Sequence, residues 1–321
     1  MRVLLLPDLA LVERPDPRPA EGELLVSVRA VGLNRADLLQ RRGRYPAPPG
    51  WPADIPGLEY AGVVVATGTG VTRFSVGDRV MGLVGGGAMA EQLVVHEDEA
   101  IAVPDRLSDI EAAAIPEAFL TAWDALVVRG RAEPGDRVLV HAIGSGVGTA
   151  ALQFAPLLGV TMIGTSRTPA KLERCLALGL HHGVLTTDAD WPTAVGAPVQ
   201  VIIDTLGAEA LAANLGLLAP LGRLVVLGTM TGPEAPIDLG VVLRKRLSIV
   251  GTAMRSRGPA ERRALVARFR DEVLPLLAGG ALSPVVDAVV PIAEAARAYD
   301  LLAGNGTLGK VVVEVRGEGD Q

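Results

Sequence analysis

Cysteine, aromatic residues and an excess of basic charge are all scarce in this 321-residue sequence. Its single cysteine, Cys175, can form neither an internal disulfide nor a multi-cysteine zinc or iron–sulfur site, which favours a reducing, cytoplasmic setting. Aromatic residues make up 3% of the chain, too few for a platform that stacks single-stranded bases. The formal net charge is −6, so we do not expect nucleic acid as the main partner.

A long uninterrupted apolar run is also missing. Residues 138–166 carry no Asp, Glu, Lys or Arg, but glycines and Pro156 interrupt them throughout. At the amino terminus, Leu4–Leu6 is followed at once by Pro7, which makes the apolar stretch too short for a signal peptide. The sequence therefore predicts neither a membrane span nor secretion.

Short β-rich stretches separated by Pro and Gly fill the first hundred or so residues and predict a small, mostly antiparallel β domain. Residues 44–52 contain four prolines, which fix φ and remove amide donors, so we expect a surface or cleft loop there. The expected strands are 23–31, 60–67, 78–84, 91–96 and 100–103.

From Arg137 onward, apolar stretches alternate with segments of helical length. This alternation predicts a doubly wound parallel sheet, buried on both faces. After residue 260 we expect helices at 261–277 and 293–303, and a last strand at 310–315 that closes either domain. A polar tail follows Arg316. The expected strands of the parallel sheet are 137–142, 161–166, 183–187, 199–206, 223–228 and 247–252.

A glycine-rich turn follows the first of these strands and opens a helix. Backbone amides and a helix amino terminus at such a turn can face a pyrophosphate. The hexapeptide departs from G-x-G-x-x-G, since Ile143 and Ser145 occupy the first two glycine positions, and a turn without a ligand is the alternative. The candidate cofactor-binding residues here are Gly144, Ser145, Gly146, Val147 and Gly148.

The end of the second expected strand lacks the acid that an NAD enzyme usually places near the ribose 2′-hydroxyl. Ser166, Arg167 and Lys171 stand there instead. A hydroxyl and two cations suit a 2′-phosphate, because arginine offers paired donors to phosphate oxygens. We therefore expect NADP(H), the alternative being that both cations are simply solvated.

Seven segments together resemble the medium-chain dehydrogenase/reductase superfamily, and the resemblance covers nearly the whole chain. It is strongest to the zinc-free NADPH quinone oxidoreductase branch, similar to tumour-suppressor-inducible quinone oxidoreductase and more distantly to zeta-crystallin. The segments are GLNRAD (32–37), GRYPAPPG (43–50), GLEYAG (57–62), VGDRV (76–80), PEAFLTAW (116–123), the turn within 141–151, and GKVV (309–312).

The resemblance implies a Rossmann NADP-binding domain (119–259) inserted in a GroES-like β-rich catalytic domain (1–118 and 260–321), with NADPH in the cleft between them. It implies a homodimer formed by pairing the edge strand at 247–252. It also places Asn34 and Tyr45 at the substrate as catalytic residues and Thr121 at the carboxamide, with Gly228 and Lys310 as further cofactor-binding residues.

The same resemblance argues against zinc. Zinc-dependent relatives carry a cysteine where Asn34 stands, a Gly-His-Glu where this sequence reads Gly57-Leu58-Glu59, and a four-cysteine lobe. A tetrahedral zinc site lacks its ligands here, so we expect no metal.

These features predict a zinc-independent, NADPH-dependent quinone oxidoreductase that transfers hydride to a planar small-molecule acceptor in the cleft. Asn34 and Tyr45 would stabilise the negative charge that develops on the acceptor oxygen. An NADPH-dependent enone or enal reductase needs the same geometry and is the nearest alternative. An NADPH-binding sensor or structural protein with little turnover is the alternative from another class.

Overall fold

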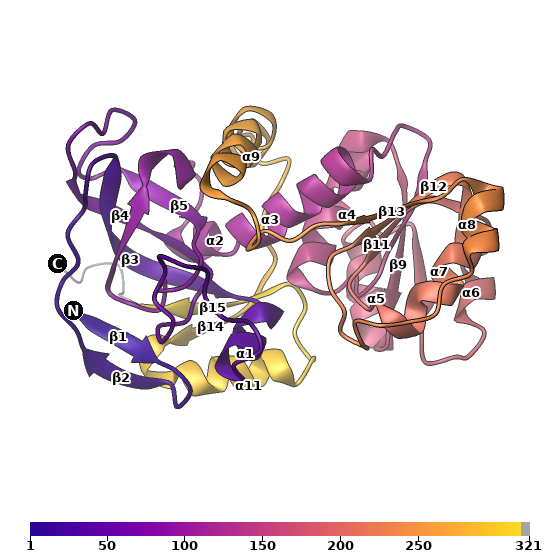
Figure 1. Cartoon of the computed structure of the whole chain (residues 1–321), viewed down its shortest axis with the longest axis horizontal. Coiled ribbons are helices and arrows are strands. Elements are labelled where there is room, and N and C mark those ends of the chain that lie inside the picture. The colour runs from indigo at the N-terminus through magenta and orange to yellow at the C-terminus, as the bar shows by residue number, and fades with distance from the viewer. Residues whose placement is uncertain (316–321) are drawn as a thin grey trace. The chain divides into compact units, whose positions relative to one another are not determined.

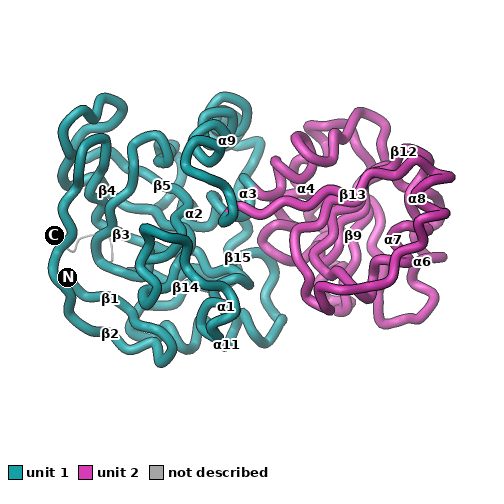
Figure 2. The backbone as a smooth tube through the Cα atoms, in the orientation of Figure 1, with its two compact units in different colours: residues 1–120, 255–321 teal, residues 121–254 magenta. Residues whose placement is uncertain are grey.

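The computed structural model describes residues 1–315 and divides the chain into two compact units, coloured separately in Figure 2. Unit 1 comprises Met1–Leu120 and the segment that begins at Arg255, whereas unit 2 comprises Thr121–Met254. The polar tail expected after Arg316 lies outside the described residues.

Unit 1 is built on a seven-stranded sheet in the order β14-β15-β3-β4-β5-β7, with β6 also paired to β3 (Figure 1). All of its strand pairs are antiparallel except β14 with β15. The last strand therefore belongs to unit 1, a question that the sequence left open. The strands are β3 (Glu23–Leu33), β4 (Glu59–Thr67), β5 (Arg79–Leu83), β6 (Gln92–His96), β7 (Ala100–Ala102), β14 (Val286–Pro291) and β15 (Lys310–Glu314).

Alternating aliphatic side chains of β3, such as Leu24, Val26 and Val28, form the core of unit 1 with Tyr60 and Tyr299. A two-stranded sheet of β1 (Arg2–Leu5) and β2 (Ala10–Glu13) lies outside the main sheet. The helices of unit 1 are α1 (Arg35–Arg41), α2 (Asp109–Ala113), α9 (Pro259–Glu272), α10 (Leu274–Ala278) and α11 (Ala295–Ala303), and α3 (Pro116–Trp123) crosses the unit boundary. Short 3-10 turns are η1 (Glu97–Glu99) and η4 (Ile292–Glu294).

The single helix expected at 261–277 is wrong, because the structure breaks it into α9 and α10 at Val273. In a continuous helix, Pro275 would have no amide hydrogen to donate to the Asp271 carbonyl, and its ring would clash with that carbonyl. Pro275 instead occupies the first turn of α10, where that hydrogen is not needed.

Unit 2 is a six-stranded parallel sheet in the order β10-β9-β8-β11-β12-β13, with helices on both faces (Figure 1). In sequence order this is 3-2-1-4-5-6, the order of a Rossmann fold, which confirms the predicted fold class. The strands are β8 (Arg137–Val140), β9 (Thr161–Ser166), β10 (His182–Leu185), β11 (Val199–Asp204), β12 (Leu218–Val226) and β13 (Ser248–Gly251). The helices are η2 (Asp124–Arg129), α4 (Gly146–Leu158), α5 (Pro169–Ala177), α6 (Trp191–Ala194), η3 (Ala208–Ala210), α7 (Leu211–Leu217) and α8 (Leu239–Lys245).

Two glycines let α4 and β9 approach the turn after β8. A Cβ at Gly148 would lie 2.3 Å from the Ile143 carbonyl oxygen, and a Cβ at Gly164 would lie 2.6 Å from Ile143 Cγ1. Real Cβ atoms do not approach so closely, so packing is by itself a sufficient reason for glycine at both positions. The strand order reverses between β8 and β11, and ligands of such sheets bind where the chain leaves the carboxyl ends of these strands.

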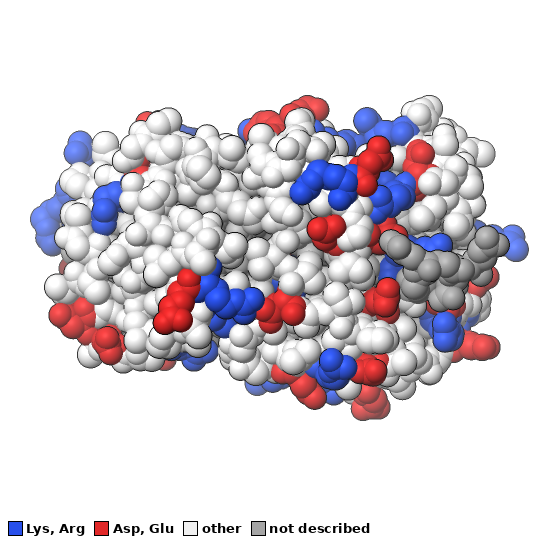
Figure 3. All heavy atoms as spheres, turned by 180° about the vertical axis from the view of Figure 1, so that it is seen from behind, with Lys and Arg blue, Asp and Glu red and all other residues white. Residues whose placement is uncertain are grey.

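Charged side chains of both signs are intermixed on the face shown in Figure 3. That face carries no broad area of basic charge. Among the described residues, every helix is too short or too polar to span a bilayer.

A series of buried hydrogen bonds in unit 2 determines which ring nitrogen of His141 carries the hydrogen. Asn214 Nδ2 donates to Asp204 Oδ2 over 3.2 Å, so Asn214 Oδ1 is the acceptor that lies 2.8 Å from His141 Nε2. His141 Nε2 therefore carries the hydrogen, and Nδ1 accepts one from Thr165 Oγ1 at 2.9 Å. Burial lowers the pKa of His141, so the imidazole is neutral in the folded protein.

We predict that His141→Gln changes how the stability of unit 2 depends on pH. In the wild type the unfolded chain gains a proton near pH 6.5 that the folded chain does not, so stability falls as the pH drops. The free energy of unfolding of the wild type minus that of the variant should decrease by about 1 kcal/mol between pH 7.5 and 5.5. Urea unfolding at each pH measures this difference.

His182→Gln is the matched control, since the His182 side chain is exposed and its Nε2 lies 2.8 Å from the Ala194 carbonyl oxygen. Its stability should follow the wild-type pH dependence. Parallel curves for the wild type and His141→Gln would contradict the neutral assignment.

Candidate functional site

The ammonium group of Lys310 is the centre of a buried polar network in unit 1. Its Nζ donates to Leu33 O at 2.8 Å, to Asn34 Oδ1 at 2.6 Å and to Glu59 Oε1 at 2.6 Å. The Lys310 and Glu59 side chains are 3% and 0% exposed, so the ion pair is shielded from water. All three ammonium hydrogens therefore have acceptors within the protein.

Three element ends bring these residues together. Asn34 follows β3 and caps α1, Glu59 begins β4, and Lys310 begins β15, whose Val311 pairs with Leu33 of β3. At Gly32, a Cβ would lie 2.4 Å from Glu59 Oε1, so the absence of a side chain there leaves space for the carboxylate.

The network also fixes the orientation of the Asn34 amide. Because an ammonium group only donates and a carboxylate only accepts, Oδ1 faces Lys310 and Nδ2 faces Glu59 Oε1, at 2.7 Å. A second Nδ2 contact, to Gly32 O, measures 3.4 Å and is long for a hydrogen bond. One Nδ2 hydrogen is thus weakly held and available to a ligand.

Two carboxyl groups near this network have strongly raised pKa values. Asp37 is fully buried, its Oδ2 accepts from the backbone N–H of Asn34 at 2.8 Å, and its burial raises the pKa to about 7. Desolvation, and then the Glu59 carboxylate, raise the pKa of Glu117 to about 7. Glu59 itself accepts from the Glu117 amide at 2.8 Å. Both groups therefore change charge near neutral pH.

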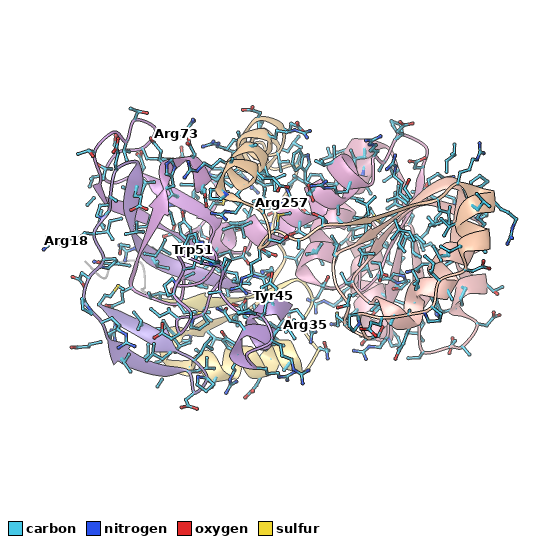
Figure 4. All side chains as sticks on the ribbon, in the orientation of Figure 1. Arg18, Arg35, Tyr45, Trp51, Arg73 and Arg257 are labelled. Atoms are coloured by element: carbon cyan, nitrogen blue, oxygen red, sulfur yellow. The ribbon has the colours of Figure 1, made fainter. Side chains whose placement is uncertain are left out.

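Tyr45 lies on the irregular segment between α1 and β4, where Figure 4 also labels Trp51. The Arg255 guanidinium is 4.0 Å from the centre of the Tyr45 ring and donates to Tyr45 O at 2.7 Å. Arg255 also donates to Gly85 O at 2.5 Å, so it joins two loops. Burial raises the pKa of the Tyr45 phenol to about 12, which keeps it protonated and able to donate at neutral pH.

The residues that the sequence resemblance aligns with zinc ligands do not fit a zinc ion. Leu58 is aliphatic, and the ammonium group of Lys310 lies within 2.6 Å of both Asn34 Oδ1 and Glu59 Oε1. A second cation would be repelled from that position. In residues 1–315, moreover, the structure shows no group of three or more His, Cys, Asp or Glu side chains suited to a metal.

In unit 2, the residues that the sequence associates with a dinucleotide follow the carboxyl ends of neighbouring strands. The turn after β8 leads into α4, where Ser145 Oγ accepts from Gly148 N at 3.1 Å. Ser166 ends β9, Arg167 beside it is exposed, and Lys171 lies on α5. Gly228 follows β12, and a Cβ there would lie 3.1 Å from Thr205 O. The parallel sheet thus gathers these positions at one edge.

Two buried hydroxyls in unit 2 have no hydrogen-bond partner among the described residues. One is Thr121 Oγ1, a position that the sequence resemblance assigns to the cofactor, and the other is Thr205 Oγ1. Thr205 directly follows β11 at the strand-order reversal. Sequence reasoning missed Thr205, although a hydroxyl placed just after an apolar parallel strand is a usable signal. Unpaired buried hydroxyls are uncommon and suit a polar ligand.

Two family models match the chain. The alcohol dehydrogenase GroES-like domain matches residues 20–105, and the zinc-binding dehydrogenase model matches residues 146–272. The name of the second model describes the family as a whole. In this chain, the metal ligands discussed above are absent from their expected positions.

Similar proteins include a quinone oxidoreductase of Pseudomonas aeruginosa, 34% identical over 94% of this chain and 95% of its own length. Polyketide synthase GfsB of Streptomyces halstedii is 36% identical over 92% of this chain, but the chain spans only 5% of that protein.

Solved structures show the same fold. The quinone oxidoreductase of Thermus thermophilus, described with its NADPH complex, is 37% identical with a TM-score of 0.84, covering 98% of this chain and 100% of that one. The CurK enoyl reductase is 27% identical with a TM-score of 0.86, covering 98% and 99%. With both domains and nearly the whole of this sequence matched, the chain belongs to the medium-chain dehydrogenase/reductase superfamily of oxidoreductases.

Proposed function

We propose that the protein is a zinc-independent, NADPH-dependent quinone reductase. The observation that carries this proposal is the Lys310–Asn34–Glu59 network, in which an ammonium group contacts two residues that the sequence resemblance aligns with zinc-ligand positions. Reduction of an unactivated carbonyl benefits from a Lewis acid. A quinone already accepts hydride readily and needs chiefly alignment and hydrogen-bond donors, which this site offers.

We assign cofactor binding to the domain expected at 119–259. The amides of the turn Gly144–Gly148 and the start of α4 would bind the pyrophosphate, since a helix amino terminus favours negative charge. The unpaired hydroxyl of Thr121 suits the carboxamide, and that of Thr205 suits another polar group of the dinucleotide. Bound NADPH supplies the hydride.

In this proposal, the protein selects NADPH over NADH by binding the 2′-phosphate. Arg167 is exposed and free of a described ion pair, and Ser166 stands beside it at the end of β9. Lys171 on α5 adds a second positive charge to this region. Gly228 lies close to Thr205 and would permit a close approach of the cofactor.

Acceptor recognition belongs to the domain formed by 1–118 and 260–321. The protonated phenol of Tyr45 and the weakly held Nδ2 hydrogen of Asn34 are both donors. As hydride arrives, charge develops on an acceptor oxygen, and donors that are already oriented stabilise that charge without reorganisation. Arg255 and Lys310 hold these two side chains through the contacts described above.

An enone or enal reductase is the second candidate, and the similarity to the CurK enoyl reductase structure favours it. An activated carbon–carbon double bond also accepts hydride without a metal. A low-turnover NADPH-binding protein is the remaining candidate, which the oriented donors Asn34 and Tyr45 disfavour. We also propose a cytoplasmic location, following from the cysteine content.

We predict that the purified protein oxidises NADPH with quinones, and that exhaustive chelation leaves the rate unchanged. A panel of quinones, enones and aldehydes, each assayed before and after chelation, measures this. Turnover on enones alone would support the second candidate, and turnover on none would support the binding protein. Loss of activity on chelation would contradict zinc independence.

We predict that Arg167→Asp weakens NADPH binding and leaves NADH binding unchanged or improved. The change removes a charge-assisted donor, which contributes about 1.5–3 kcal/mol, and adds a repulsive charge. The dissociation constant for NADPH should therefore rise about tenfold to hundredfold. Arg174→Asp, the same change at a residue of α5 farther from the end of β9, is the control and should have little effect. Equal binding of both cofactors by the wild type would refute this site.

We also propose a homodimer formed through β13, which is an edge strand of the unit 2 sheet. Its Ile249 side chain is 43% exposed, and an exposed apolar edge strand favours pairing with another chain. Ile249→Lys should convert the dimer into a monomer, whereas Val289→Lys, at an equally exposed aliphatic residue of unit 1, should not. Light scattering at micromolar concentration measures the mass; a monomeric wild type would contradict the proposal.

A further inference from the structure

Lys310 binds side chains, and this distinguishes it from the other well-coordinated lysine described in the chain. The Lys245 ammonium also contacts three oxygens, but all three are backbone carbonyls, of Leu215, Gly216 and Leu218. Such contacts hold a segment of backbone. Two of the three Lys310 acceptors are instead the Asn34 amide and the Glu59 carboxylate.

We propose that Lys310 is a positioning residue, whose ammonium acts as a built-in cation that orients the Asn34 amide. Its donors are fully used within unit 1 and its side chain is 3% exposed, which leaves no hydrogen for the cofactor contact expected from the sequence. The turnover part of this inference rests on the proposed function, whereas the cation-site part does not.

The orientation follows from the charges of the two neighbours. Lys310 attracts Oδ1 and Glu59 attracts Nδ2, so a flipped amide would place like-signed atoms against each of them. Without the ammonium, Oδ1 loses the charged donor that lies opposite Glu59. Asn34 would then adopt several rotamers, and its weakly held Nδ2 hydrogen would no longer be aimed in one direction.

Removing the side chain beyond Cβ would leave an oxygen-lined cavity. The carbonyl of Leu33, the amide oxygen of Asn34 and the carboxylate of Glu59 would all remain, and the carboxylate would be buried without its cation. An uncompensated buried charge is strongly destabilising. Ammonium or methylammonium ions, which supply the missing charge and donors, should therefore bind this cavity.

The experiment compares Lys310→Ala with Lys245→Ala in the full chain. Ammonium and methylammonium chloride should raise the melting temperature of Lys310→Ala in a saturable way. Tetramethylammonium chloride at equal ionic strength should not, because it carries the charge but supplies no N–H donors. Lys245→Ala should show no saturable, amine-specific rise in melting temperature. Absence of amine-specific stabilisation would overturn the cation site, whatever the activity.

Turnover tests the positioning role. At a temperature where the variant is folded, kcat of Lys310→Ala should fall about tenfold to hundredfold, as for loss of an oriented donor, with KM for NADPH little changed. Methylammonium should restore kcat. A raised KM for NADPH with unchanged kcat would overturn the proposal in favour of a cofactor contact, and stabilisation without recovery of kcat would reduce Lys310 to a purely structural role.

Two further variants keep the test decisive. Lys310→Met fills the cavity, so it should show the same loss of kcat but no response to amines, even if Lys310→Ala does not fold. In an Asn34→Ala background, Lys310→Met should reduce kcat little further, because the residue through which it acts is gone. Independent, multiplying losses would contradict the inference. An inactive wild type would refute the proposed function and leave the thermal test valid.

Discussion

The ion pair between Lys310 and Glu59 is the interaction on which the organisation of unit 1 depends. A buried carboxylate or ammonium group is tolerable only with an opposite charge and with its remaining hydrogen-bonding atoms paired. Here the pairing joins the starts of β4 and β15 to the end of β3, and it continues through Asn34 into α1. The same contacts that make the charges tolerable also fix the candidate catalytic amide, so stability and orientation have one physical cause.

Much of the fold could be predicted from periodicity. The strand at 161–166 matches β9 residue for residue, and the alternation of apolar strands with helical segments predicted the parallel sheet of unit 2. Helix α1 and the pair β1–β2 were not expected, because both are short and their apolar pattern is weak. The sequence could not predict which strand pairs with the last one, because pairing between strands that are far apart in the sequence leaves no local signal.

The candidate site, too, was predictable only in part. The glycine turn and Ser166 with Arg167 are local patterns, so the sequence alone indicated them. Lys310 was noticed only as part of a motif, because its partners Asn34 and Glu59 are 276 and 251 residues away. The raised pKa values of Asp37 and Glu117 arise from burial and from neighbouring charges, neither of which can be read from local sequence.

The position of β15 between β3 and β14 has a consequence for folding during synthesis. Unit 2 is complete once residue 254 has been made, and its sheet uses no strand from elsewhere in the chain. The sheet of unit 1, in contrast, lacks an inner strand, and Glu59 lacks its cation, until residue 310 leaves the ribosome. After unit 2 has been made, the first 120 residues therefore still lack this strand, and the Glu59 carboxylate is still uncompensated. The order of synthesis therefore delays assembly of the site until residue 310 has been made.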